Sequence, residues 1–134
     1  MVKKWRFIIV DAIKITMKDL APNIYRQRLV IEGLYTTEIN PSKLRKFMKN
    51  LSTQLGMTII YGPIVKNLAA NINPIHKGFE CILIWAESGT SVYTWENKNF
   101  FTVDIYTCKR FDVNTTVNFI RNFFEAKEIE FKNV

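Results

Sequence analysis

Two stretches of the chain repeat apolar residues at the spacing of an amphipathic helix. In the first, the positions i, i+3, i+4, i+7 and i+11 are Leu44, Phe47, Met48, Leu51 and Leu55. Asn40-Pro41 before this stretch and Gly56 after it are typical signals for the start and the end of a helix. The second stretch follows Asp112, a typical N-cap residue, and its apolar face is Val113, Val117, Ile120, Phe123 and Phe124. The pattern therefore predicts two helices, each with one apolar face.

Six other stretches have the β-branched and aromatic content of short strands and are bounded by turn residues. They are residues 27–35, 57–65, 78–86, 91–96, 100–108 and 128–131. Gly62-Pro63 in the second of them predicts an edge strand, a bulge or the start of a loop, and residues 66–77 are expected to form that loop. Residues 87–90 are expected to turn the chain, and Asn97-Lys98-Asn99 predicts a hairpin between the flanking strands.

The order of these elements is strand, helix, four strands, helix, strand. It predicts an α+β fold, a two-layer sandwich in which an antiparallel sheet carries both helices on one face. Cys81 to Ala86 is apolar at nearly every position, which is typical of a strand covered on both faces. We therefore expect a homodimer whose two sheets pack together as a four-layer α/β/β/α sandwich. This domain would span residues 27–134, after an N-terminal extension or extra strand at residues 1–26.

Composition and charge narrow the class of protein. A chain of 134 residues that is 48% hydrophobic and 23% charged is typical of one globular domain. Residues 1–50 hold eleven basic and four acidic side chains, whereas residues 51–134 hold eight of each. Such a basic half could meet nucleic acid, an anionic membrane surface or an acidic partner. Because aromatic residues are not interleaved with the basic ones, as base stacking requires, we expect a solvated face and no nucleic-acid partner.

The numbers of cysteine and histidine residues indicate the cellular compartment of the protein and whether it binds a metal ion. Cys81 and Cys108 are too few for a disulfide scaffold and indicate a reducing, cytoplasmic compartment. They do not have metal-ligand spacing, and the one histidine, His76, is expected to be solvated in a loop, so we expect no metal site. No apolar run has the length needed to span a bilayer, so we expect no membrane partner.

Two polar segments interrupt the most apolar part of the chain. They read Glu87-Ser88-Gly89-Thr90-Ser91-Val92-Tyr93-Thr94-Trp95-Glu96-Asn97 and Asp104-Ile105-Tyr106-Thr107-Cys108. Together they resemble, without a gap, the signature of the small prokaryotic S-adenosylmethionine decarboxylases, E-S-H-x-S-x-H-T-W-P-E followed by D-x-F-T-C. The surrounding strands and helices fall where that family has them, so the resemblance covers residues 27–134.

The resemblance implies a pyruvoyl enzyme that makes its own prosthetic group. The chain would break between Glu87 and Ser88, and Ser88 would become the pyruvoyl group at the start of the new chain. That group forms a Schiff base with the substrate amine, and Cys108 would be the proton donor after decarboxylation. The implied substrate is S-adenosylmethionine, and the implied role is polyamine (spermidine) biosynthesis. The implied substrate-binding residues are Ser91, Trp95, Glu96, Asn97 and Phe79.

The chain departs from the first segment of this signature at three places. Tyr93 replaces the histidine before Thr-Trp, Glu96-Asn97 replaces Pro-Glu, and Gly89 replaces the histidine after the serine. The first matters most, because a tyrosine with a reference pKa near 10 is a weaker base than imidazole at neutral pH. Tyr93 is nevertheless the residue expected to take the α-proton during processing.

Three functions stay open at this point. The first is an S-adenosylmethionine decarboxylase, and the second is a pyruvoyl decarboxylase of another amine such as arginine. The third is an unprocessed relative that binds a ligand or regulates a partner. Without the resemblance, Ser88 would be a turn residue, Cys108 a small core residue, and Tyr93 and Trp95 core aromatics.

Overall fold

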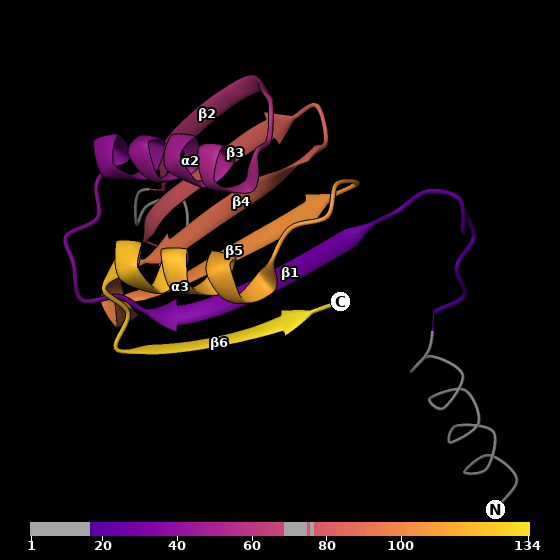
Figure 1. Ribbon diagram of the computed structural model, residues 1–134. Coiled ribbons are helices and arrows are strands. Elements are labelled where there is room, and N and C mark those ends of the chain that lie inside the picture. The colour runs from indigo at the N-terminus through magenta and orange to yellow at the C-terminus, as the bar shows by residue number, and fades with distance from the viewer. Residues whose placement is uncertain (1–16, 69–74, 76) are drawn as a thin grey trace, which may run out of the picture.

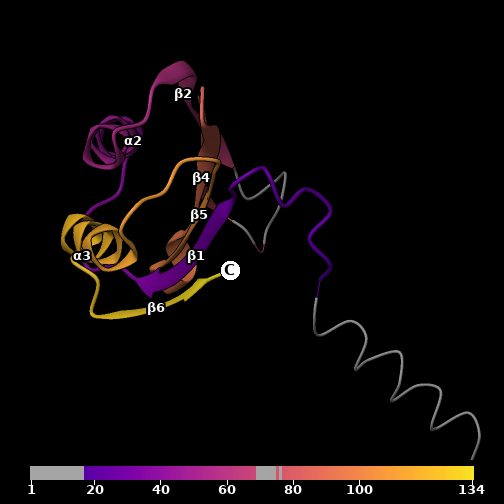
Figure 2. The ribbon, with the colours of Figure 1, turned by 45° about the vertical axis from the view of Figure 1, so that its right-hand side comes forward.

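The computed structural model describes residues 17–68, 75 and 77–134. Over these residues two helices lie on one face of a six-stranded antiparallel sheet with the order β2-β3-β4-β5-β1-β6 (Figures 1 and 2). The elements are β1 (Gln27–Leu34), α2 (Pro41–Leu55), β2 (Ile59–Leu68), β3 (Gly78–Trp85), β4 (Ser88–Trp95), the 3-10 turn η1 (Glu96–Lys98), β5 (Phe100–Thr107), α3 (Val113–Phe124) and β6 (Glu128–Asn133). The predicted α+β fold and element order are confirmed.

Both helices begin where the sequence signals predict, and α2 also ends at its predicted signal, Gly56. The Asn40 side chain accepts a hydrogen bond from the Lys43 backbone N–H at 2.8 Å, and Gly56 ends α2 in the left-handed conformation with a φ of 68°. The Asp112 side chain accepts from the Thr115 backbone N–H at 2.7 Å, which caps α3. These caps satisfy backbone groups that a helix leaves free at its ends.

The core lies between the helices and the sheet. Phe101 of β5 stacks on Phe124 of α3 with ring centroids 4.1 Å apart. The indole N–H of Trp85 donates to the Ser52 hydroxyl at 2.8 Å, so the one polar atom of this buried side chain is satisfied. Alternate residues of β3, β4 and β5 thereby point toward α2 and α3.

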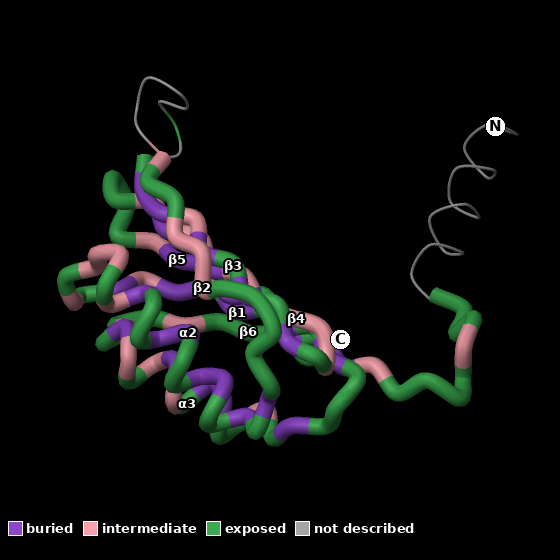
Figure 3. Tube along the Cα trace, turned by 90° about the horizontal axis from the view of Figure 1, so that it is seen from above, coloured by how far each residue is buried: buried purple, intermediate pink, exposed green. Residues whose placement is uncertain are grey.

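The other face of the sheet, which we call the open face, carries the remaining residues of the strands. Figure 2 shows the helices on one side of the sheet and the chain that leads into β1 on the other. Along β3, buried residues alternate with Ile82 and Ile84, which are each 43% exposed, and Figure 3 shows this alternation in the sheet. In a single chain β3 is therefore covered on one face only, and cover by a second subunit stays a prediction.

Several predicted boundaries were wrong. β2 continues beyond residue 65 to Leu68, because Lys66 and Leu68 pair with β3 across the register shifts around Gly62-Pro63, which mark the predicted bulge. The turn after β3 is only Ala86-Glu87, since Ser88 already pairs with Trp85.

The ends of the chain differ from expectation in smaller ways. β6 runs to Asn133 because it pairs with β1 along that length. Residues 17–26 contain no strand, while residues 1–16 and His76 lie outside the described residues. None of the described helices is long and apolar enough to cross a membrane.

Candidate functional site

Ser88 stands at the junction of the turn and β4. It pairs with Trp85 on β3 and with Thr107 on β5, so a strand borders it on each side. Its φ is 125°, in a region that residues with a side chain rarely adopt. Such a conformation costs on the order of 1–3 kcal/mol and persists only when the surrounding structure enforces it. The residue expected to be converted is thus held in a strained backbone.

Glu87 is held from two directions. Its carboxylate accepts a hydrogen bond from the Thr58 backbone N–H at 2.6 Å, and its own carbonyl oxygen accepts from the Cys108 backbone N–H at 2.9 Å. The Ala86 N–H in turn donates to the Thr58 carbonyl at 2.9 Å. The connection between α2 and β2 and the end of β5 therefore keep the Glu87-Ser88 peptide in place. An N–H aimed at this carbonyl would also stabilise negative charge that develops on its oxygen.

Cys108 lies one residue beyond the end of β5, and its side chain is exposed. It is therefore not a core residue, because Thr107 and not Cys108 takes the last buried position of the strand. The structure brings the Cys108 backbone next to the Glu87-Ser88 peptide, as the resemblance implies. Cys81 is different: it is buried under α2, and burial raises the pKa of its thiol to about 11.

Gly89 follows Ser88 at a point where the backbones of β3 and β4 are close. A Cβ atom at position 89 would lie 2.7 Å from the Leu83 carbonyl oxygen, which is closer than real Cβ atoms approach. The hairpin thus accepts only glycine without moving. A side chain at this position, such as the histidine of the signature, would force the two backbones apart.

The open face above Gly89 is hollowed. The hollow has a volume of about 410 Å³, and its lining includes Arg28, Ser91, Asp104 and Tyr106. The Asp104 carboxylate is exposed there, so its charge needs no buried basic partner. Sequence reasoning did not single out Arg28, although the period-two pattern of residues 27–34 was enough to place it on the face opposite the core.

Ser91, Tyr93 and Trp95 all point to the open face and are half-buried. Trp95 packs on Phe100 with ring centroids 5.1 Å apart. Tyr93 is five residues from Ser88 along β4, about 16 Å at the usual rise of a strand. Within one chain, Tyr93 therefore does not lie beside the α-proton of Ser88.

The remaining expected substrate residues lie far from Ser88. Glu96 and Asn97 are exposed in η1, at the opposite end of β4, where Glu96 pairs with Lys77 at 3.5 Å. Phe79 is buried on the helix side, and its backbone N–H donates to the Thr94 hydroxyl at 2.9 Å. The structure therefore does not bring Phe79 together with Ser91 and Trp95, because odd positions of β3 face the core.

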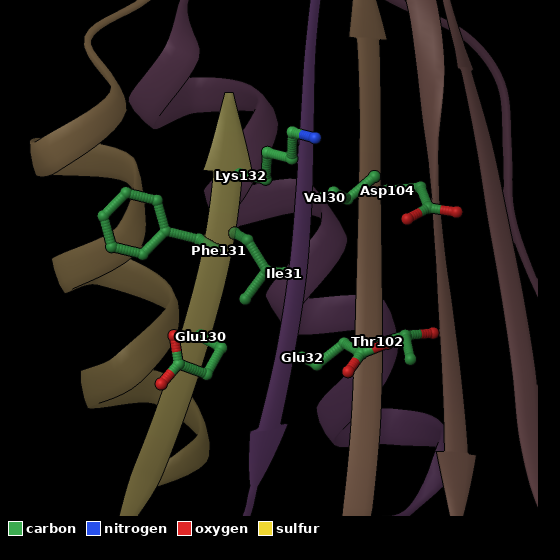
Figure 4. A pocket seen from close by; sticks show the side chains of 8 residues that line it. All are labelled: Val30, Ile31, Glu32, Thr102, Asp104, Glu130, Phe131 and Lys132. Carbon is green, nitrogen blue, oxygen red and sulfur yellow. The ribbon is translucent and has the colours of Figure 1, made fainter. Parts of the chain in front are cut away.

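A second hollow of about 490 Å³ adjoins the first on the open face (Figure 4). Its carboxylates are Glu32 on β1, Asp104 on β5 and Glu130 on β6, and Lys132 lies on the same edge strand. Across the described residues, no group of three or more histidine, cysteine, aspartate or glutamate side chains is arranged to hold a metal ion.

Comparison with known proteins agrees with this arrangement. A sequence model of the S-adenosylmethionine decarboxylase family matches residues 35–134. The S-adenosylmethionine decarboxylase proenzyme of Clostridium botulinum strain Hall is 28% identical over 104 residues, which are 77% of this chain and 80% of that protein. The proenzyme of Pyrococcus furiosus is 39% identical over 51 residues, which are 37% of each chain. The adenosylmethionine decarboxylase structure from Aquifex aeolicus shares the fold, with a TM-score of 0.64, 19% identity, and coverage of 83% of this chain and 89% of that one.

Proposed function

Because the chain belongs to the S-adenosylmethionine decarboxylase family, we propose that it cleaves itself at Glu87-Ser88 and decarboxylates S-adenosylmethionine for polyamine synthesis in the cytoplasm. The single observation that carries this proposal is the Glu87-Ser88 link. Ser88 has a φ of 125°, and the Glu87 carbonyl oxygen accepts the Cys108 N–H at 2.9 Å. The strain favours breaking this peptide bond, and the N–H stabilises the charge that forms as it breaks.

The processing chemistry needs no reactant besides the protein itself and water. The Ser88 hydroxyl oxygen attacks the Glu87 carbonyl carbon, a C–O bond replaces the C–N bond, and the hydroxyl proton goes to the released nitrogen. Removal of the Ser88 α-proton then expels Glu87 as a carboxylate and leaves a C=C bond at residue 88. After tautomerisation, water hydrolyses the resulting imine, ammonia leaves, and a ketone remains.

Removal of the α-proton requires a base beside Ser88. Tyr93 lies about 16 Å along β4 from Ser88, so it reaches this proton only from a second copy. The exposed Ile82 and Ile84 on the open face support such a homodimer, because their burial between two sheets would be favourable. We propose that, in the four-layer sandwich, Tyr93 of the second copy supplies this base.

In the decarboxylation itself, the pyruvoyl group supplies the electron sink for loss of the substrate carboxylate. Cys108 has the exposed side chain next to residue 88 that a proton donor needs. We assign substrate contacts to Ser91, Trp95, Glu96 and Asn97, of which the latter three lie at the far end of β4. Phe79 could contact the substrate only if its ring moved from the helix side of the sheet to the open face.

Intact mass under denaturing conditions tests the proposal. The wild-type chain of 15.7 kDa should give two fragments that divide at Glu87-Ser88, whereas Ser88→Ala should stay whole and folded. Ser91→Ala is the matched control, because it removes a serine hydroxyl from the same strand and should still be cleaved. A wild-type chain that stays whole after long incubation would reject the enzyme and leave the unprocessed, ligand-binding relative.

Substrate assays on the processed protein separate the two decarboxylases. Release of CO₂ from S-adenosylmethionine, and not from arginine, is expected. Release from arginine alone would reassign the substrate and keep the processing chemistry. The domain of residues 27–134 should suffice for both reactions, since the sheet begins at Gln27 with β1 and the family match covers residues 35–134.

A further inference from the structure

Arg28, Tyr106 and Gly89 lie side by side across three strands of the open face. Arg28 on β1 is opposite Tyr106 on β5, and Tyr106 is opposite Gly89 on β4. Neighbouring strands are about 4.8 Å apart, so the Cα atoms of Arg28 and Gly89 are about 10 Å apart. Because Gly89 has no side chain, nothing on β4 separates the Arg28 side chain from the start of that strand. Residue 88 directly precedes Gly89 on β4, so a molecule attached there that extends over the open face meets the guanidinium.

The guanidinium of Arg28 is held in place but not neutralised. Its Cζ atom lies 4.6 Å from the centroid of the Tyr106 ring, a cation–π arrangement. The salt bridges among the described residues are Arg26 with Asp19 and Lys77 with Glu96, so Arg28 has no carboxylate partner there. A guanidinium that lies over a ring by its face keeps its N–H edge available to bind an anion.

The hollow beside Gly89 has one cationic group. Arg28 is the only basic side chain in its lining, and Asp104 on the same lining would repel a carboxylate. An amino-acid substrate joined through its amine at residue 88 carries its α-carboxylate two bonds from that nitrogen. Within this hollow, the N–H edge of Arg28 is the place where such a carboxylate is stabilised, because a guanidinium binds a carboxylate through two parallel hydrogen bonds.

We propose that Arg28 binds the α-carboxylate of the substrate and so selects α-amino acids over amines at this site. The inference rests on the proposed function for the place of the substrate amine. By holding the carboxylate, Arg28 also determines which bond to the substrate α-carbon faces the reacting group, and orientation of this kind is a large part of catalysis. Release of the product follows from the same contact, since the product has lost the carboxylate.

The test compares ligands that differ only in the carboxylate. Binding of S-adenosylmethionine and of its decarboxylated form is measured by calorimetry on Ser88→Ala protein, together with L-arginine and agmatine. Arg28→Met should weaken the carboxylate-bearing member of whichever pair binds by about ten- to hundredfold, as expected for hydrogen bonds between charged groups, and leave the other member unchanged. Arg28→Lys should restore part of the loss.

Arg110→Met is the matched control. Arg110 also lies over a tyrosine ring, with its Cζ 5.1 Å from the centroid of Tyr25, but it does not line the hollow. It should change neither affinity. Equal losses for both members of a pair, or full affinity for the carboxylate in folded Arg28→Met protein, would overturn the proposal, as would binding of none of the four ligands. Because every measurement uses the uncleaved protein, failure of self-cleavage in the wild type is a separate result.

Discussion

Replacing Ser88 by glycine and by alanine separates the strain of the cleavage site from its chemistry. Both changes remove the hydroxyl that starts processing, so both proteins should stay whole. Only glycine adopts the φ of 125° without steric cost. If Ser88 is strained as the structure shows, Ser88→Gly should be the more stable of the two uncleaved proteins.

The expected difference is about 1 kcal/mol. The conformation of Ser88 costs a residue with a Cβ on the order of 1–3 kcal/mol, and the extra backbone entropy that glycine loses on folding reduces this difference by about 0.5–1 kcal/mol. With an unfolding entropy of about 2.1 cal/mol/K per residue, a chain of 134 residues shifts its Tm by about 3–4 °C for each kcal/mol. Ser88→Gly should therefore melt about 3 °C above Ser88→Ala.

Urea unfolding and thermal melts of the two proteins measure this difference, with intact mass confirming that neither is cleaved. Ser91 provides the internal control, because it lies on the same strand and is not among the described residues with a positive φ. There the order should reverse, with Ser91→Gly less stable than Ser91→Ala by about 0.5–1 kcal/mol. If Ser88→Gly were no more stable than Ser88→Ala while the control behaved as stated, the strain argument would fail.

Three more predictions follow from the site. Cys108→Ala should lower turnover at least tenfold and change the free energy of unfolding by less than about 0.5 kcal/mol, since the side chain is exposed. In the native protein a thiol reagent should modify Cys108, whereas Cys81, whose thiol is buried and has a pKa of about 11, should react only on unfolding. Gly89→Ala should destabilise the uncleaved Ser88→Ala protein by about 1–3 kcal/mol in urea melts, because its Cβ meets the Leu83 carbonyl; an unchanged midpoint would contradict this. Tyr93→His should speed cleavage about 10²-fold or more if position 93 supplies the base, and a Ser88→Ala chain that carries it should speed cleavage of a co-folded wild-type chain; equal time courses in folded proteins would remove residue 93 from this role.

The helices were predictable because their signals are local. Asn40 and Asp112 accept backbone N–H groups three residues ahead, and Gly56 ends its helix through its own φ. The length of β2 was not predictable, because Leu68 belongs to the strand only through its pairing with Gly78. The residue types around Leu68 and Gly78 do not show that these two residues, ten positions apart in sequence, pair with each other.

In the candidate site, too, some features could be predicted from the sequence and others depend on how the strands pair. Ser88 and Cys108 come close together because Ser88 begins β4 opposite Thr107, the residue before Cys108. Strand periodicity also puts Tyr93 and Trp95 on one face. Neither the φ of Ser88 nor the stacking of Arg28 on Tyr106 could be read from residue types, since each depends on how β4 and β1 border β5.

Gly89 links the departure from the signature to the proposed carboxylate site. The close approach of the Leu83 carbonyl means that a histidine at position 89 would move β4 away from β3, and Ser88 would lose the pairing that enforces its φ. Glycine keeps that strained geometry and leaves the open face beside Tyr106 bare. Arg28 can then reach residue 88 across Tyr106, which a bulkier side chain at position 89 would hinder. The absence of a side chain at position 89 therefore both keeps β3 and β4 close together and leaves the proposed Arg28 site open.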